Sequence, residues 1–342
     1  MGLTVKRRLP FVLLFVLVAA AILHMGFARE RPDVASLCAW LLSWTGLLEA
    51  PDAAERFVLG DIRAPRLLVA IFGGGALALA GTVMQATFRN PLASPDIIGT
   101  AAGAAFGGAL AIVFGWADAG VAFTPALAML GAVGVTSLVF VLAGANGRFT
   151  VANLLLAGVA LNTLFGALTS FVITFVFDNY TASSRVLFWL MGGLDARTWQ
   201  HAWITAGGFV VFSALVWRRA RELDLLTLRD DSAHSLGVDA QRARRTLVWW
   251  ACGLTATTVA NSGGIAFVGL IVPHLARLLV GPAHRVLLPT AALLGAVLMV
   301  LSDLACRTAP ASWNLRLGVV TAIAGAPYFL YLLARQRRGQ AL

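Results

Sequence analysis

The chain has 342 residues, of which 59% are hydrophobic and only 12% are charged, and its mean hydropathy is +0.82. Globular domains carry about 25% charged residues, so this composition excludes a soluble globular domain and indicates an integral membrane protein. The net charge of +10 is spread over short segments between apolar blocks. No basic face with interleaved aromatic residues is present, which argues against a nucleic-acid-binding protein.

The apolar blocks predict an all-α, polytopic membrane protein with one transmembrane domain over residues 1–342. The first run, from Leu9 to about Phe27, exceeds the roughly 7–15 residues of a signal-peptide core, so we expect a retained helix. A polar loop is expected over residues 29–62, and a second span follows Arg63. Eight further blocks bring the total to ten spans: 97–114, 121–142, 151–177, 202–217, 246–260, 265–280, 286–304 and 317–333. The short blocks within 246–280 could be tilted, broken or half-length helices.

Glycine and alanine fill the body of the second span, in the stretch RAPRLLVAIFGGGALALAGTVMQATFRNPLASP from Arg63 to Pro95. Small residues let helix backbones approach closely within a membrane, so we expect this helix to pack against protein rather than lipid. Gln85, near the end of the span, should face protein or water.

The basic residues predict the orientation of the chain. With ten spans, seventeen of the twenty-six Lys and Arg residues share a side with the N-terminus. The positive-inside rule then places both termini and the long segment 218–245 in the cytoplasm, and residues 29–62 in the periplasm. We therefore expect a multi-pass protein of a bacterial inner membrane.

Lys6 is the only lysine, so the phosphate-binding motif G-x-x-x-x-G-K-[ST] cannot be present. If ATP drives this protein, another chain binds the ATP and its magnesium, and we expect no cofactor on this chain. The three cysteines have no metal-type spacing, and the sequence contains no H-E-x-x-H motif. We therefore predict no metal site and no catalytic residue.

Several motifs then occur in a characteristic order. The first is R-x-P-R, a Gly/Ala-rich span and MQ-x-x-x-RNPLA-x-P; the second is GGIAFVGLIVPHLARLLVGPAHRVLLP, from Gly263 to Pro289, followed by Asp303 and by GVVTAIAGAPYFLYLL. LLLAG-x-AL and WLMGGL lie between them. Together they resemble the FecCD-type permease family, the membrane subunits of ABC importers for iron-siderophores, haem and cobalamin.

The resemblance implies a ten-helix subunit with the fold of the cobalamin importers. It also implies a second permease subunit, either an identical copy or a paralogue, with the substrate pathway at their interface. Two cytoplasmic ATPase subunits and a periplasmic binding protein would complete the importer, and membrane lipid would surround it. This arrangement explains the missing phosphate-binding motif.

Binding-protein docking is the role that the resemblance gives to outer arginines, here Arg63, Arg66 and Arg307. The alternative is that these side chains extend to lipid headgroups. Where the family has Glu-Leu-Pro before the last span, this chain has Asn314, Leu315 and Arg316. Arg316 could add a docking contact, although the proline that would stiffen the turn is lost.

The segment LTLRDDSAHSLGV, from Leu226 to Val238, resembles the short helices that contact the ATPase in the family, whereas a plain reading is a solvated loop. We expect Ser232–Leu236 to be helical and Gly237 to end that helix. The predicted coupling residues are Arg229, Asp230, Asp231, His234, Ser235, Leu236, Gly237 and Val238.

The resemblance also predicts a cytoplasmic gate at Asn90 and Leu92, with a second constriction at Thr150, Val151 and Ala152. The alternative for Asn90 and Leu92 is an ordinary turn. Asn162 and Thr321 could line the pathway, although such polar residues more often form hydrogen bonds between helices.

The sequence therefore predicts the permease subunit of an importer for ferric siderophores, with haem or cobalamin as alternative substrates. The rival of a different class is a secondary transporter driven by an ion gradient. Such proteins keep ionisable residues near the middle of the membrane. Here the charges within spans are confined to positions near span ends, such as Arg277 and Asp303.

Overall fold

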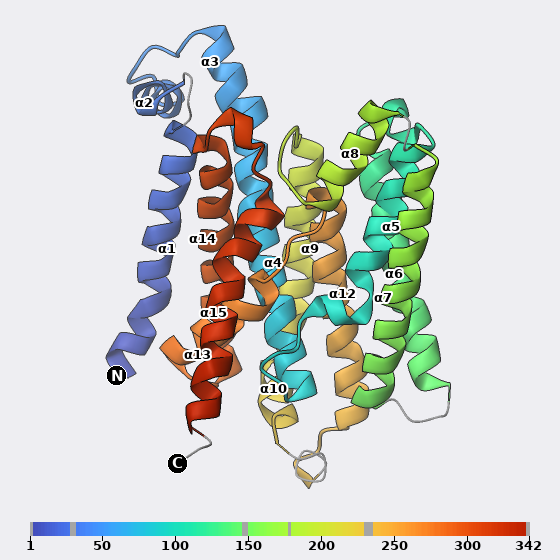
Figure 1. The fold of residues 1–342 in the computed structure, drawn as a ribbon. Helices are drawn as coiled ribbons and strands as arrows, with labels where there is room; N and C mark the ends of the chain where they lie inside the picture. Colours follow the sequence, from blue (N-terminus) through green and yellow to red (C-terminus); the bar gives the residue numbers. More distant parts are fainter. Residues whose placement is uncertain (1–2, 28–31, 146–149, 177–178, 229–234, 340–342) are drawn as a thin grey trace.

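The computed structural model describes residues 3–27, 32–145, 150–176, 179–228 and 235–339. The helices of this part of the chain stand side by side as a bundle (Figure 1). The long helices and their bounds are α1 (Leu3–Gly26), α4 (Ala64–Phe88), α5 (Thr100–Val113), α6 (Phe123–Gly144), α7 (Val151–Thr174), α9 (Trp199–Arg218), α12 (Ala240–Ser262), α13 (Val268–Val280), α14 (His284–Thr308) and α15 (Leu317–Gly339). The shorter helices are α2 (Val34–Ser43), α3 (Ala53–Phe57), η1 (Val58–Arg63), η2 (Pro95–Ile98), η3 (Trp116–Ala119), α8 (Tyr180–Leu190), α10 (Ala220–Leu226) and η4 (Ala311–Trp313).

The ten long helices coincide with the ten predicted spans. Within the described residues, five stretches are long and apolar enough to cross a membrane: 9–26, 53–88, 123–144, 151–174 and 284–308. The others are shorter or less apolar. The helix α13 has only 13 residues, and α12 begins at Ala240, six residues before the predicted span, because Arg242, Arg244 and Arg245 belong to its first turns.

The bundle has two ends, which we call the upper and lower ends as they lie in Figure 1. The upper end carries α2, α3 and α8. The lower end carries α10, the start of α1 and the end of α15 (Figure 1). The start of α1 and the end of α15 thus lie at the same end as α10, as an even number of spans requires.

The centre of the bundle is α4, which packs against α9, α12, α13 and α14. Every residue from Gly73 to Phe88 is buried. A Cβ atom at Gly81 would overlap the backbone carbonyl of Gly269 in α13, and one at Gly74 would overlap that of Gly295 in α14. The prediction that this helix packs closely against protein is confirmed, and the glycines are what allow the contact.

The polar end of α4 is also bound by protein. Gln85 is 3% exposed, and its Nε2 donates to the carbonyl of Leu270, 2.9 Å away. Its Oε1 accepts from Nη1 of Arg277 at 3.1 Å. These two bonds attach α4 to α13 at the lower end, and they satisfy an amide that would otherwise be costly to bury.

Much of the predicted loop 29–62 is helical. Asp33 caps α2 by accepting from the backbone N–H of Ser36 at 3.0 Å, and Asp52 caps α3 by accepting from that of Glu55 at 2.7 Å. Leu37 of α2 and Leu59 of η1 pack with Met25 of α1 in a small buried cluster. The loop prediction followed the acidic residues, but two of them start helices, because a carboxylate accepts well from the free N–H groups of a first turn.

Several helices of the bundle, among them α1, α6, α7, α9 and α15, expose large apolar side chains. The helix α7 exposes large apolar side chains along its length, including Leu156 (71%), Phe171 (60%) and Phe175 (67%). On α15, Ile323 and Leu330 are similarly exposed. Faces of this size and composition fit lipid or another protein chain.

Candidate functional site

A buried carboxylate organises the upper end of the molecule. Asp303 of α14 is fully buried and binds the guanidinium of Arg66, at the start of α4, through two hydrogen bonds. These join Nε to Oδ2 at 2.7 Å and Nη2 to Oδ1 at 2.8 Å. Planar two-point pairs of this kind are the strongest that Arg forms with a carboxylate.

A third donor reaches the same carboxylate. His24 of α1 is fully buried, and its Nε2 lies 2.7 Å from Oδ2 of Asp303. Its Nδ1 lies 3.4 Å from Nη1 of Arg307, which also donates to the His24 carbonyl at 2.8 Å. These partners assign a neutral ring in which Nε2–H donates and Nδ1 accepts. The terminal helix α1 is therefore attached to α14 through polar contacts.

The network continues to the surface through Asp195, in the loop between α8 and α9. One oxygen of Asp195 accepts from Nη1 of Arg66 and the other from Nη1 of Arg316, each at 2.7 Å. The guanidinium of Arg316 also lies over the ring of Phe188, 4.0 Å from its centroid. Asp195 and Asp303 are the two carboxylates of this cluster, and they face four arginines, Arg66, Arg197, Arg307 and Arg316. The cluster therefore has more positive than negative charge.

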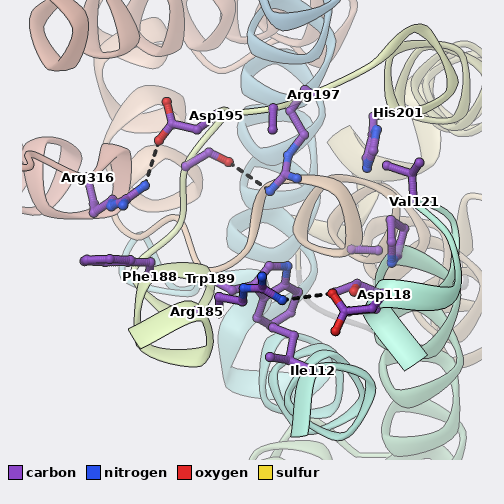
Figure 2. Close-up of a pocket in the computed structure, with 16 residues that line it drawn as sticks. Ile112, Asp118, Val121, Arg185, Phe188, Trp189, Asp195, Arg197, His201 and Arg316 are labelled. Carbon is purple, nitrogen blue, oxygen red and sulfur yellow. Dashed lines mark hydrogen bonds and ion pairs between the residues drawn. The ribbon is translucent and has the colours of Figure 1, made fainter. Parts of the chain in front are cut away.

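Beside this network lies a cavity of about 400 Å³ between α5, α6, α8, α9 and the loop 191–198 (Figure 2). Its lining includes three arginines, Arg185, Arg197 and Arg316. Burial lowers the pKa of Arg197 to about 10, and the negative charge of Asp195 partly opposes that change. Arg197 thus keeps its proton and its charge at neutral pH.

The predicted docking residues occupy different environments. Arg66, Arg307 and Arg316 are partly exposed and belong to this network. Arg63 is 3% exposed, and its Nη1 donates to the carbonyls of Met25 and of Pro32, the latter at 2.8 Å. Its side chain lies in the interior and holds the start of the α1–α2 connection against η1.

The lower end has a second polar network, which ties the predicted gate to the coupling segment. Arg89, directly before the gate residues, has a left-handed backbone with φ of 49°, and its Nε donates to the carbonyl of Leu226 in α10 at 2.8 Å. Asp224 of α10 accepts from both the backbone N–H (2.9 Å) and Nδ1 (2.6 Å) of His284, the first residue of α14. The segment that begins with α10 is therefore bonded to α4 and to α14.

Asn90 and Leu92 form a turn: Oδ1 of Asn90 accepts from the N–H of Leu92 at 2.9 Å, and both residues are exposed. Thr150 caps α7 through its Oγ1, which accepts from Asn153 N–H at 3.2 Å. Val151 and Ala152, half-buried and exposed, form the first turn of α7. These positions put the five predicted gate residues at helix ends, where a turn or a cap is their local role.

The coupling residues Arg229, Asp230, Asp231 and His234 lie outside the described residues, as do Ser232 and Ala233 of the predicted short helix. Ser235 has helical backbone and Leu236 is 54% exposed. Gly237 has φ of 82°, the left-handed conformation expected where a glycine ends a helix. Val238 is half-buried against the core.

The two pathway candidates both make hydrogen bonds within the chain. Nδ2 of Asn162 in α7 donates to the carbonyls of Asp96 (2.9 Å) and Ile97 (3.2 Å) in η2. Thr321 is 2% exposed, and its Oγ1 donates to the carbonyl of Gly318 at 3.1 Å. Asn162 thus matches the alternative of a hydrogen bond between helices, whereas the bond of Thr321 lies within α15.

Sequence reasoning missed the network around Asp303. The available signal was that Asp303 interrupts an apolar span, where an acidic residue needs a partner. Neither His24, in a separate helix, nor Asp195, in a loop, carries a pattern that identifies it as part of the same cluster. Only the packing of α1, α4 and α14 brings these side chains together.

Comparison with known proteins adds to this geometry. The sequence profile of the FecCD transport family matches residues 34–335. The chain belongs to the FecCD transport family. It is thus a multi-pass membrane permease of that family, and the all-helical bundle with a buried central α4 is its FecCD fold.

Among curated FecCD relatives, a cobalamin import system permease protein, BtuC of Halobacterium salinarum, is 41% identical over 292 residues, which cover 85% of this chain and 77% of the relative. The molybdate import permease MolB of Haemophilus influenzae is 35% identical and covers 97% of both chains. The Fe(3+) dicitrate permease FecD of Escherichia coli is 39% identical over 86% of this chain and 91% of its own length.

A solved structure of a metal-chelate type ABC transporter in an inward-facing conformation has the same fold. It superposes with a TM-score of 0.82 at 33% identity, and the match covers 96% of this chain and 99% of the other. This match confirms the predicted ten-helix bundle and the predicted ABC importer permease fold.

Removal of the buried charge at the upper end should destabilise the protein. Replacing Asp303 by Asn leaves the guanidinium of Arg66 without its two-point partner in a site where Asp303 is 1% exposed. Losing one member of a buried pair costs about 3–5 kcal/mol. We expect a clear fall in the thermal unfolding temperature of the purified D303N protein.

The matched control is Asp118→Asn, which breaks the pair between Asp118 and Arg185 at 2.9 Å. Both side chains of that pair are more than half exposed, so its loss should cost at most about 1 kcal/mol. Equal unfolding temperatures for D303N and D118N would contradict the role given to the buried carboxylate.

Proposed function

We propose that this chain is the inner-membrane permease of a binding-protein-dependent ABC importer that carries ferric siderophores. ATP hydrolysis on a separate cytoplasmic subunit would drive transport, with ATP and magnesium bound there and not on this chain. The observation that carries the choice of substrate is the cluster of four arginines around the two carboxylates Asp195 and Asp303. Chelates of ferric iron with oxygen donors are commonly anionic, and a cationic entrance raises their local concentration.

The relatives support an importer and leave several cargoes open. FecD acts on ferric dicitrate by its name, while others are named for cobalamin and molybdate. Of these, ferric dicitrate and molybdate are anionic. Cobalamin and haem are the alternative substrates for this chain, and the arginine cluster around Asp195 and Asp303 favours the anionic chelates over cobalamin.

The exposed faces suggest how the importer is assembled. We infer that a second permease subunit covers the apolar residues of α7 and α15, where Leu156, Phe171, Ile323 and Leu330 are each more than half exposed. The upper end would then face the periplasm and the lower end the cytoplasm. In this orientation, Asn90 and Thr150 lie at the cytoplasmic end of an interface pathway.

The upper arginines would receive the periplasmic binding protein. Arg307 and Arg316 are partly exposed, and Arg66 lies just beneath Asp195. Arg63 is buried and would act indirectly, through its bonds to the chain just before α2. Charges at the rim of an interface mainly set the rate of association.

Neutralising one rim charge tests the docking role. Arg307→Gln should slow the association of the binding protein with the permease roughly fivefold at low salt, and the difference should shrink as salt screens the charges. Surface plasmon resonance on reconstituted permease gives this rate. Arg56→Gln, an exposed arginine of α3 outside the network, is the control, and equal rates for both variants would count against docking at Arg307.

The lower network would pass ATPase movement to the gate. The segment 226–238 would sit against the ATPase. Its Leu226 carbonyl accepts from Arg89, and Asp224, two residues before it, holds His284, so the segment is connected to α4 and α14. Leu236, which is 54% exposed with no partner chain present, is the apolar residue that an ATPase cleft would bury.

A charge at Leu236 should therefore uncouple ATP hydrolysis by the ATPase from substrate uptake. In proteoliposomes with the ATPase and binding protein, we expect Leu236→Asp to abolish uptake while the permease still inserts and folds. The control is Leu47→Asp, the same change at a 71% exposed residue before α3. Normal uptake by L236D would refute the coupling role.

The substrate and the energy source are tested in the same proteoliposomes. We expect uptake of a ferric siderophore that requires ATP and the ATPase subunit and exceeds that of haemin, cyanocobalamin and molybdate. Faster uptake of one of the other three would overturn the siderophore assignment but keep the importer. Uptake without the ATPase, driven by a proton or sodium gradient, would overturn the importer itself in favour of a secondary transporter.

A further inference from the structure

The cavity beside the upper charge network has the features of a ligand site. Its volume of about 400 Å³ lies within the range of roughly 300–1,000 Å³ seen for small-molecule pockets. The apolar part of its lining includes Ile112, Phe188 and Trp189. Figure 2 shows Arg197 reaching in from the loop on one side, with Arg185 on the opposite side and Arg316 at the edge.

The three arginines of the cavity differ in how their charges are balanced. Arg185 pairs with Asp118 at 2.9 Å, and Arg316 shares Asp195 with Arg66. Within the part of the chain that the structure describes, Arg197 has no ion pair, and its one hydrogen bond is a long one of 3.3 Å from Nη2 to the carbonyl of Gly193. Arg197 therefore supplies the uncompensated charge.

Two donors in this cavity also lack acceptors. The Nε atoms of Arg197 and Arg316 are both buried and have no hydrogen-bond partner among the described residues. A guanidinium that is buried with an unused donor is costly, so such groups are normally paired. The cavity thus presents positive charge and free N–H groups, and what it lacks is an acceptor with negative charge.

Other polar groups on the walls do not fill this need. Nδ1 of His201 is already bonded to the Thr198 hydroxyl at 2.9 Å. Both oxygens of Asp195 are engaged by Arg66 and Arg316, and Asp118 pairs with Arg185, so each carboxylate of the walls is already matched by a guanidinium.

We propose that this cavity binds a small organic anion through a carboxylate or similar oxyanion group, with Arg197 as its main partner and Arg316 as the second. Guanidinium groups match planar carboxylates in shape and charge. The aromatic side chains Phe188 and Trp189 would pack against the carbon skeleton of the ligand. The site is a property of this chain by itself and needs neither the ATPase nor a binding protein.

Calorimetric titration of the purified permease in lipid nanodiscs with citrate tests the site. We expect saturable binding that weakens as salt is raised, at least tenfold weaker binding by Arg197→Gln, and affinity within twofold of the unaltered protein for Arg56→Gln. Choline, a small organic cation, should give no saturable heat. Citrate binding that is unchanged in R197Q, or absent at millimolar concentrations in the unaltered protein, would overturn the assignment.

Two further variants guard against a folding defect in R197Q. Arg197→Lys keeps the positive charge and should retain more affinity than R197Q. Thr124→Trp adds bulk at the wall without changing any charge, and it should block citrate while the unfolding temperature stays near that of the unaltered protein. Unimpaired citrate binding by T124W would place the anion outside this cavity and refute the proposal.

Titration with ferric citrate shows whether the cavity recognises the free anion or its iron chelate. Binding of both citrate and ferric citrate, each lost in R197Q, would assign recognition to the free carboxylate group. Binding of ferric citrate alone would assign recognition to the intact chelate and would overturn the assignment to a free carboxylate. Because neither titration involves transport, the site and the importer can fail independently.

Discussion

The carboxylate of Asp303 joins helices at the upper end that lie far apart in the sequence. It receives donors from α1 and α4 while it belongs to α14, so three helices from both halves of the sequence meet at one buried charge. An ion in such a place is stable only if nearly all its lone pairs are used. That requirement fixes how Arg66 and His24 are oriented, and through Arg66 it fixes Asp195 and Arg316.

Close backbone contact is the second constraint. The helix α4 lies in the centre because glycines at 74 and 81 let it approach α14 and α13 until backbone meets backbone. Contacts this short leave no freedom to slide, because a small shift would bring neighbouring side chains into collision. The polar clusters at the two ends are therefore attached to a centre with a fixed register.

The sequence was sufficient for the number and order of the long helices, because apolar length and small-residue content are local properties. It also identified α4 as a helix within protein and Gly237 as a helix end. It was insufficient for α2 and α3, whose acidic caps looked like loop residues, and for the burial of Arg63, which depends on how α1 packs. The network around Asp303 was beyond it for the same reason: the partners lie 237 and 279 residues away in sequence.

The helix α14 carries a carboxylate–imidazole contact at each end. It contributes the imidazole to the contact at its start and the carboxylate to the contact near its last turn. His284, its first residue, is held by Asp224 of α10, whereas Asp303, near its last turn, holds His24 of α1. His284 and Asp303 are 19 positions apart, which corresponds to about 28 Å of helix, and the backbone hydrogen bonds of α14, interrupted only at Pro289, resist compression. Because the register of α14 with α4 is fixed, an axial displacement of α10 would either break the lower contact or move these two helices together. At the far end, such a movement would load the contact of Asp303 with His24 of α1, while the pair of Asp303 with Arg66 of α4 would be carried along.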